Sequence, residues 1–340
     1  MDPLEALDET AALLERELAP AFKVKAFRRA AAVVAAWTPE ELAARASDGR
    51  LKATKGIGDR TLQIITQALD GQVPDYLADL RSRVTTTLSD GGRELRDRLR
   101  GDLHAHSEWS DGTTDIATMA RAARALGHDY QALTDHSPHL TVAHGLTAER
   151  LREQLDVVDG LNAEAAPGFR LLSGIEVDIL DDGALDQEPA LLDRLDVVVA
   201  SVHSKLREDS TTMTKRMLAA LAAPRIDVLG HCTGRLVQGS RGTRPPSEFD
   251  AAAVFAACAE AGVAVEINSR PERQDPPDDL IALALEAGCL FSIDSDAHAP
   301  GHLGFIELGA ERAAAAGVPA ERIVTTWPLE RLLEWTHRGR

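Results

Sequence analysis

The chain has 340 residues, of which 44% are hydrophobic and 27% charged, and its formal net charge at pH 7 is −17. These proportions are typical of a globular protein, and no apolar stretch approaches the roughly 20 residues that a membrane-spanning helix needs. The start of the chain, Met1-Asp-Pro-Leu-Glu-Ala, lacks the basic and then apolar pattern of a secretory signal. The three cysteines form no CxxC pair, which favours a reduced compartment. We therefore expect a cytoplasmic protein.

The charge is distributed unevenly along the chain. Residues 1–100 carry 16 basic and 16 acidic side chains, so the entire excess of negative charge lies in the remainder. A strongly acidic body disfavours non-specific adhesion to nucleic acid or to an anionic membrane. Bound divalent cations would reverse the local sign and leave an electropositive pocket that can hold a phosphate.

Residues 1–80 are predicted to form an all-helical domain. Apolar residues recur at helical spacing, and helices are expected over 4–18, over 22–37, from Thr38 onward and over 59–70. Thr38 is the candidate N-cap of the third helix, because Pro39 follows it and Glu41 stands three residues on, as in a capping box. The first helix is expected to end at Pro20.

Residues 81–100 hold six arginines around Gly91 and Gly92, a glycine pair that we expect to interrupt a helix or linker joining two domains. From residue 101 onward, short apolar runs alternate with helical segments, which is the pattern of parallel strands joined by helices. The helices are expected near 114–127, 148–164, 212–222, 248–262, 278–288 and 303–317. About seven strand–helix units fit residues 101–340, so we predict a (β/α) barrel there.

Residues that commonly bind metals stand at or just past the ends of the predicted strands. They are His104, His106, Asp111, His136, Glu176, His203, His231, Asp296 and His298. Successive parallel strands end at the same mouth of a barrel, so we expect these side chains to converge there, although each taken singly could be an ordinary polar residue at a strand end. Imidazoles and carboxylates without a cysteine quartet suit hydrolytic divalent metals better than a structural zinc site. The other histidines, expected to be ordinary surface residues, are His128, His139, His144, His302 and His337.

The same segments resemble the PHP (polymerase and histidinol phosphatase) superfamily. The motifs are Asp102-Leu-His-Ala-His106, Ser110-Asp111-Gly112, Thr134-Asp135-His136, Gly174-Ile-Glu176, Ser201-Val-His203, Gly230-His231 and Ser295-Asp296-Ala-His298. The resemblance covers essentially 101–340 and is greatest for the PHP domain attached to bacterial X-family DNA polymerases. It implies an α/β fold, a distorted (β/α)7 barrel, with three divalent metal ions in its mouth.

By this resemblance, the three ions would have separate but overlapping ligand sets. One ion would be held by His104, His106, Glu176 and Asp296, a second by Glu176, His203 and His231, and a third by Asp111, His136 and His298. A metal-bound hydroxide would attack phosphorus while the cations neutralise charge on the phosphoryl oxygens. Zinc, manganese and iron all suit these ligands, so the identity of the metal stays open.

Further residues of the predicted mouth are candidates for catalysis and substrate binding. Those expected to bind phosphate oxygens are Arg235, Arg270 and Lys205, with Arg244 and Arg273 as weaker candidates. Asp102 and Asp135 flank ligand histidines and are expected to fix imidazole tautomers, the alternative being ordinary strand-end residues. Asn268 ends the sixth predicted strand and is a further polar candidate, whereas Cys232 is interpreted as a packing residue.

The stretch Lys55-Gly56-Ile57-Gly58-Asp59-Arg60 resembles the hairpin of a helix-hairpin-helix element, and 1–80 is similar to the N-terminal 8-kDa domain of X-family polymerases. Two glycines permit a tight turn whose backbone N–H groups, at a helix N-terminus, can bind a DNA phosphate. The DNA-binding candidates are Lys52, Lys55, Gly56, Gly58 and Arg60. A helix start of purely structural importance is the alternative interpretation.

Two features of the X-family polymerases are missing from the sequence. Only the short 81–100 segment separates the helical domain from the predicted barrel, so there is no polymerase palm between them and nucleotidyl transfer is not expected. Ile64 stands where eukaryotic relatives carry the lysine that forms a Schiff base with an abasic sugar. Lyase activity by that route is therefore not expected, although a substitute could come from Lys23, Lys25, Lys52 or Lys55.

These observations favour a metal-dependent phosphoric ester hydrolase that acts on DNA ends, as a 3′–5′ exonuclease or 3′-phosphatase in DNA repair. A small-molecule phosphatase of the histidinol-phosphatase type is the first alternative, which the acidity of 101–340 favours. A DNA-associated scaffold without catalytic activity is the second, although every expected ligand is in place. The expected partner is a phosphorylated substrate, with DNA preferred and no membrane.

Overall fold

The computed structural model describes residues 1–84, 86–165, 167–239 and 242–338, and it separates into two compact units, Met1–Thr87 and Leu88–Arg340. The division falls inside the 81–100 segment that was expected to join two domains, and the finer boundaries of the domains stay a prediction. The last two residues of the expected barrel domain lie outside the described residues.

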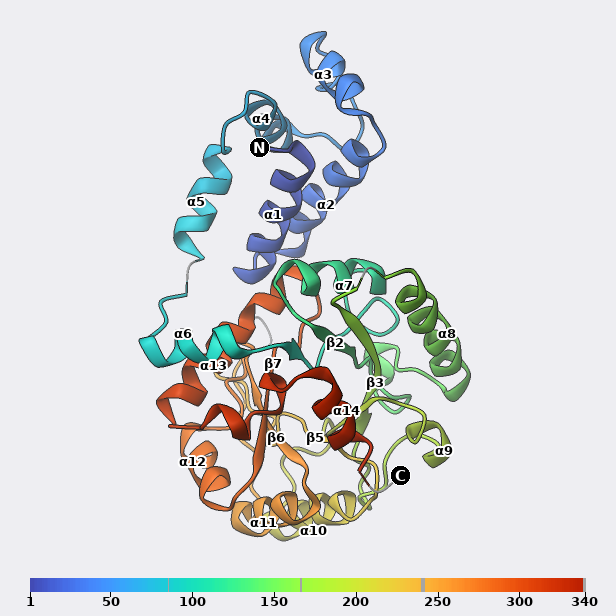
Figure 1. The fold of residues 1–340 in the computed structure, drawn as a ribbon, viewed down its shortest axis with the longest axis vertical. Helices are drawn as coiled ribbons and strands as arrows, with labels where there is room; N and C mark the ends of the chain where they lie inside the picture. The colour runs from blue at the N-terminus through green and yellow to red at the C-terminus, as the bar shows by residue number, and fades with distance from the viewer. Residues whose placement is uncertain (85, 166, 240–241, 339–340) are drawn as a thin grey trace. The chain divides into compact units, whose positions relative to one another are not determined.

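The first unit is helical, as predicted (Figure 1). Its helices are α1 (Pro3–Arg16), α2 (Ala21–Ala35), α3 (Pro39–Ser47), α4 (Asp59–Leu69) and α5 (Asp75–Arg83). The hydroxyl of Thr38 accepts a hydrogen bond from the backbone N–H of Glu41 at 3.2 Å, so the expected N-cap of α3 is confirmed. Buried leucine, alanine and isoleucine side chains from these helices form one core, which includes Leu7, Leu14 and Ile64.

The second unit contains seven parallel strands in a nearly closed barrel, which confirms the predicted fold class. The strands are β1 (Gly101–Asp102), β2 (Tyr130–Leu133), β3 (Arg170–Asp178), β4 (Val197–Ser201), β5 (Val228–Leu229), β6 (Ala264–Asn268) and β7 (Leu290–Asp294). Each strand pairs with the next along the chain, and a parallel bridge between Ala105 and Ala297 brings the segment after β7 beside the segment after β1. Strand β4 is buried throughout, as expected for a parallel strand covered on both faces.

Helices surround the strands of this unit (Figure 1). They are α6 (Asp90–Arg98), α7 (Ile116–Ala125), α8 (Ala148–Glu164), α9 (Pro189–Leu192), α10 (Ser210–Leu221), α11 (Ala251–Ala261), α12 (Asp278–Glu286), α13 (Ile306–Ala315) and α14 (Leu329–Thr336). Six of them coincide with the predicted ranges, and the short turns of 3-10 helix include residues 300–305 before α13. None of the helices within the described residues is both long and apolar enough to cross a lipid bilayer.

The expected interruption at the glycine pair is wrong, because both glycines lie in the first turn of α6. The Ser89 hydroxyl caps this helix by accepting the backbone N–H of Gly92 at 3.0 Å. Gly92 packs against Glu311 of α13 so closely that a β-carbon there would lie 2.0 Å from a carboxylate oxygen. Glycine therefore permits close approach of two helices here instead of ending one of them.

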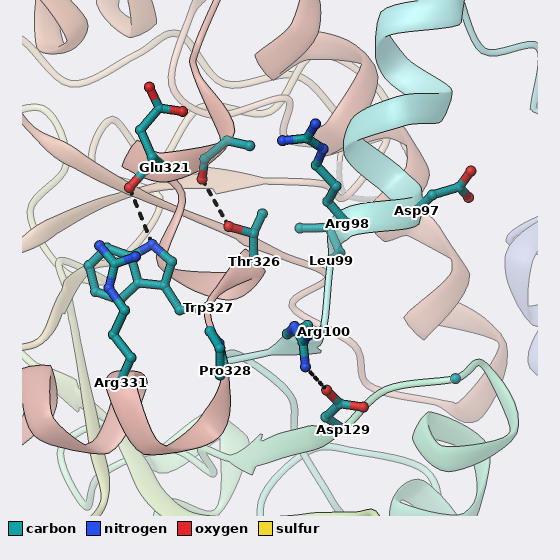
Figure 2. Close-up of a pocket in the computed structure, with 12 residues that line it drawn as sticks. Asp97, Arg98, Leu99, Arg100, Asp129, Glu321, Thr326, Trp327, Pro328 and Arg331 are labelled. Carbon is teal, nitrogen blue, oxygen red and sulfur yellow. Dashed lines mark hydrogen bonds and ion pairs between the residues drawn. The ribbon is translucent and has the colours of Figure 1, made fainter.

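A pocket of about 690 Å³ lies at the end of the barrel where the strands begin (Figure 2). Its lining includes Arg100 and Asp129, which directly precede β1 and β2 and form an ion pair at 2.7 Å, together with Trp327 and Arg331 near the end of the chain. None of the predicted ligand or phosphate-binding residues lines this pocket. The predicted site is at the opposite end, where the strands finish.

Candidate metal centre

The structure brings all nine predicted ligand residues together at the carboxyl ends of the strands. Four overlapping groups have donor atoms within 4.8 Å of one another: His106, Asp111, His136 and His298; His104, Glu176 and His231; His104, His106 and Asp296; His136, Glu176 and His203. The four groups overlap with the three ligand sets that the family resemblance implies. His106 and His136 each lie close to residues of two of these expected sets.

Glu176 stands at the centre of the cluster. Its Oε1 lies 2.9 Å from His231 Nε2 and 3.2 Å from His203 Nε2, and its Oε2 lies 3.2 Å from His104 Nε2. Burial alone would raise the pKa of Glu176, but the surrounding imidazoles, His104 first, lower it well below its ordinary value. The carboxylate is buried and neither oxygen makes a hydrogen bond of good geometry, so both are free to bind cations.

Asp296 forms a second inner group with His104 and His106. Its Oδ1 lies 3.4 Å from His106 Nε2, and its Oδ2 accepts hydrogen bonds from Arg273 Nε and Asn268 Nδ2, each at 3.1 Å. Burial lowers the pKa of His106 to about 3, helped by neighbouring imidazoles, so the ring is neutral and has a lone pair available for a metal. Both ring nitrogens of His106 are buried without a hydrogen-bond partner.

The outer group consists of Asp111, His136 and His298. Asp111 Oδ1 lies 3.3 Å from His298 Nε2 and 3.6 Å from His136 Nε2. Burial would raise the pKa of Asp111, but the hydrogen bond from His298 and the adjacent imidazoles lower it. Asp111 is 36% exposed, in contrast to the fully buried Glu176, so this group is the most accessible part of the cluster.

These residues fit divalent cations on their own chemistry. Imidazole nitrogens and carboxylate oxygens are the ligands of hydrolytic metal sites. Donor atoms of the cluster that are buried without a hydrogen-bond partner include His104 Nε2, His106 Nε2, His203 Nε2 and both oxygens of Glu176. Buried polar atoms normally have hydrogen-bond partners, so this concentration of unpartnered nitrogen and oxygen atoms favours a site for cations.

Two carboxylates that the sequence analysis missed lie directly behind ligand histidines. Glu266 Oε1 is 2.6 Å from His104 Nδ1, and Asp178 forms a short hydrogen bond with His203 Nδ1. Burial would lower the pKa of His203, but the charge of Glu176 and the bond to Asp178 raise it to about 9. Their spacing was an available signal, because Asp178 stands two residues after Glu176 on one strand and Glu266 two residues before Asn268 on another.

Within the described part of the chain, neither Asp102 nor Asp135 is hydrogen-bonded to an imidazole, so the tautomer function predicted for them is wrong. Asp102 accepts the backbone N–H groups of His104 at 3.0 Å and Ser295 at 3.2 Å, and burial raises its pKa to about 6. Asp135 accepts the hydroxyls of Ser107 at 2.6 Å and of Ser110 at 2.5 Å. Each carboxylate accepts hydrogen bonds from donors in the segments that follow the strands. Hydrogen bonds of this kind cannot be inferred from the spacing of residues along a strand.

The predicted phosphate-binding residues lie in different surroundings. Arg270 is buried with Nη1 3.0 Å from His298 Nδ1, and Arg273 contacts Asp296, so both belong to the metal cluster. Arg235 donates to the carbonyl oxygens of Arg273 and Gln274, and Lys205 is exposed and pairs with Asp181. Arg244 donates to the carbonyl of Gly234 at 2.7 Å, and Cys232 is buried in the core as expected.

His128 is also placed differently from its prediction. It was expected at the surface, yet the residue is only 2% exposed and lies beside Gln131. Burial, followed by the charge of Arg96, lowers the pKa of His128 to about 4. His139 and His144 are exposed, and His302 and His337 are half-buried.

In the helical unit the predicted hairpin forms a tight turn before α4. Gly56 has a φ of +101°, which favours glycine, and Gly58 is the N-cap residue, whose backbone N–H donates to the Thr61 hydroxyl at 2.9 Å. Lys52, Lys55 and Arg60 are exposed around this turn. Ile64 is fully buried, so the position where a lyase lysine would stand belongs to the core.

The chain was compared with known families and proteins. Residues 102–270 match the PHP domain family, and residues 1–73 match a helix-hairpin-helix domain family. The DNA polymerase/3′-5′ exonuclease PolX of Bacillus subtilis is 41% identical over 201 residues, which cover 59% of this chain and 34% of that protein. A probable phosphatase of Aeromonas hydrophila is 30% identical over 250 residues, covering 70% of this chain and 94% of that protein.

Similarity to solved structures is lower. A histidinol phosphate phosphatase from Lactococcus lactis, solved with zinc, L-histidinol and phosphate, is 18% identical, with a TM-score of 0.44 over 59% of this chain and 87% of that one.

The barrel, its ligand cluster and the match to the PHP domain family define a phosphoesterase. The chain belongs to the PHP domain family and carries an N-terminal helix-hairpin-helix domain, as the sequence motifs predicted. It is an enzyme that hydrolyses phosphoric esters, and it spans about a third of the length of the Bacillus PolX protein.

Proposed function

We propose that this enzyme hydrolyses phosphate esters at DNA ends, as a 3′–5′ exonuclease or a 3′-phosphatase in DNA repair. The observation that carries the proposal is the complete ligand cluster on the same chain as an exposed glycine hairpin flanked by Lys52, Lys55 and Arg60. The match to the Bacillus subtilis PolX, which is named a DNA polymerase/3′-5′ exonuclease, covers 59% of this chain and agrees with that substrate class.

The cluster would hold three divalent ions. The expected sets are His104, His106, Glu176 and Asp296; Glu176, His203 and His231; and Asp111, His136 and His298. Ions bound there would supply an activated water and neutralise the charge that develops on the phosphoryl oxygens. Zinc, manganese and iron remain the candidates, because all three suit imidazole and carboxylate ligands.

The side chains around the outer group would bind and orient the phosphoryl group. Arg270 is the best placed, because its guanidinium lies beside His298 and its Nε is buried without a hydrogen-bond partner. Lys205 stands at the exposed end of the segment after His203 and could contact a longer substrate. Arg235 donates to backbone carbonyls, and Asp102 is fully buried. We therefore assign each of these two residues a structural contribution and no contact with substrate.

The helical unit would add affinity for DNA without reading its sequence. Residues 58–60 at the start of α4 are exposed, and the adjacent cations are suited to phosphates. A purely structural turn remains the competing interpretation. It predicts that charge reversal at Lys52 and Lys55 leaves DNA binding unchanged.

A phosphatase for a small phosphate monoester is the second candidate. The relative from Aeromonas is named a probable phosphatase and is matched over nearly its full length by this chain, and the acidic barrel disfavours loosely held nucleic acid. A scaffold without catalysis is disfavoured, since every predicted ligand residue is present and converges.

The two enzymatic candidates are separated by comparing substrates on the full chain. Purified protein loaded with Mn²⁺ or Zn²⁺ should remove 3′-phosphates or terminal nucleotides from labelled duplexes. A Lys52→Glu/Lys55→Glu variant should lose turnover of DNA at low enzyme concentration while keeping turnover of p-nitrophenyl phosphate. Rapid hydrolysis of phosphate monoesters with intact DNA ends would reject the nucleic-acid assignment and support the small-molecule one.

A further inference from the structure

Two of the inner ligand histidines, His104 and His203, are held in place by carboxylates that are not themselves expected ligands, whereas neither ring nitrogen of His106 has a hydrogen-bond partner. Glu266 Oε1 lies 2.6 Å behind Nδ1 of His104, and Asp178 bonds Nδ1 of His203, so each ring directs Nε2 toward Glu176. Both supporting carboxylates are buried. A carboxylate that accepts the far N–H of an imidazole fixes its orientation and increases its basicity toward a metal.

Glu266 supports two ligands at once. Its Oε2 accepts the backbone N–H of His231 and the side-chain amide of Asn268, the latter at 3.2 Å. A single side chain on β6 therefore connects the ligand after β1 with the ligand after β5. Both inner positions depend on this one carboxylate.

The outer histidines have no comparable support. Nδ1 of His298 lies 2.9 Å from the carbonyl oxygen of Asp296 and 3.0 Å from Nη1 of Arg270, so an acceptor and a donor compete for it. Nδ1 of His136 lies 2.9 Å from Oε2 of Glu176, which is itself an expected ligand. Among the described residues, only carboxylates of the ligand set approach these two rings.

The charges around the inner and outer metal positions also favour tighter binding of cations at the inner positions. The inner positions are surrounded by four carboxylates, those of Glu176, Asp296, Glu266 and Asp178, and by one guanidinium, that of Arg273 on Asp296. The outer position has the half-exposed carboxylate of Asp111, and the guanidinium of Arg270 lies against His298. A neighbouring cation disfavours a second cation and favours an anion, and both effects are stronger in a buried setting.

We propose that the metal positions differ in affinity: the two centred on Glu176 fill first, and the position of Asp111, His136 and His298 fills last, assisted by phosphate. This inference rests on the proposed function, in which three ions are bound. Carboxylates that support a metal-binding imidazole typically change affinity by about 10–100-fold, so the outer position should be weaker by a factor in that range.

The test is a titration of metal-free, full-length protein with Mn²⁺, followed by equilibrium dialysis and by electron paramagnetic resonance. Two ions should bind first and show the spin-coupled signal of a close pair. The third should require at least roughly tenfold more free Mn²⁺ and give an uncoupled signal. Inorganic phosphate should lower the concentration needed for the third ion and leave the first two unchanged.

Variants assign the steps of the titration to residues. Asp111→Asn should remove the third ion alone, whereas Glu266→Gln should weaken the first two by about 10–100-fold. Asp129→Asn, at the opposite end of the barrel, should change neither step. Circular dichroism of the metal-free variants would check their folding, and Asp178→Asn replaces Glu266→Gln if the latter does not fold.

The outcomes separate this inference from the proposed function. Three ions of equal affinity, or loss of a tight ion in Asp111→Asn, would overturn the inference and leave a three-metal enzyme intact. Only two ions at saturating Mn²⁺ and phosphate would overturn the inference and the count of three together. A protein that binds no Mn²⁺ or Zn²⁺ and hydrolyses no phosphate ester would contradict the proposed function itself.

Discussion

Oε1 of Glu176 lies 2.9 Å from Nε2 of His231, yet the oxygen makes no hydrogen bond of good geometry. The other oxygen stands in the same relation to His104, at 3.2 Å. On each side of this buried carboxylate, an oxygen lies opposite an imidazole nitrogen without a hydrogen bond of good geometry. A cation bound between the strands would satisfy both carboxylate oxygens, which otherwise carry the cost of burial without a partner.

Substituting Glu176 should therefore abolish activity more completely than any other single change. Glu176→Gln removes the charge from both inner groups, so we expect phosphoesterase activity to fall by more than the roughly 100-fold that loss of a supporting residue causes. The measurement is kcat/KM on a phosphate monoester, together with metal content after dialysis. A variant that retains its metals and most of its activity would show that Glu176 is not a bridging ligand.

Arg270 and Arg235 form a matched pair for testing phosphate binding. Arg270→Gln should raise KM for phosphate esters about 10–100-fold, because a charged hydrogen bond contributes about 1.5–3 kcal/mol. Arg235→Gln should change KM much less, since its guanidinium already donates to the carbonyl of Gln274. Equal effects of the two substitutions on KM would contradict the assignment of Arg270 to the phosphoryl group.

The buried His128 should make the barrel sensitive to mild acid. Burial lowers its pKa to about 4 in the folded state, whereas in the unfolded chain the pKa is about 6.5. The unfolded state therefore binds the proton more readily, and stability is lost as the pH falls from about 6.5 toward 4, by up to about 3 kcal/mol. Above pH 6.5 the ring is neutral in both the folded and the unfolded state, so His128 adds no pH dependence to the free energy of unfolding.

Urea unfolding of metal-free protein at pH 7 and pH 4.5, followed by tryptophan fluorescence, would measure this dependence. His128→Gln should flatten it, because the amide does not titrate, and the difference between wild type and variant isolates His128 from the carboxylates. An unchanged pH dependence in the variant would show that the histidine is not protonated on unfolding in this range.

The glycine pair in α6 offers a test of helix packing within the second unit. Gly92→Ala should destabilise by about 1–3 kcal/mol, because its β-carbon would displace the Glu311 carboxylate, which accepts the backbone N–H and hydroxyl of Ser89. Gly91→Ala is the control: its β-carbon would lie 3.5 Å from that of Ala314, so a gain of up to about 1 kcal/mol in helix stability is expected. Thermal unfolding of both variants gives the comparison, and similar losses in both would contradict the packing argument.

Much of the fold followed from local sequence patterns. Apolar runs ending in a polar ligand residue, as in the segments before His203 and His231, predicted buried parallel strands, and the helices between them lie close to the expected ranges. Gly91 and Gly92 were misinterpreted because a glycine pair usually breaks a helix, and nothing local reveals that Gly92 faces Glu311. His128 was misplaced for the same reason, since its burial depends on contacts such as those with Arg96 and Gln131 that local sequence does not reveal.

The sequence alone predicted which residues converge in the candidate cluster, because the ends of successive parallel strands must meet at one mouth and each residue stands at or just past such an end. Only the tertiary structure decided which carboxylates support those ligands. Glu266 is 162 residues from His104 along the chain, and their 2.6 Å contact depends on the register and curvature of strands far apart in sequence. Asp102 and Asp135, which stand near histidines in sequence, accept hydrogen bonds from backbone and hydroxyl donors and none from an imidazole among the described residues. Local sequence determines where a strand begins and ends. Contacts across the barrel depend instead on the register and curvature of all seven strands.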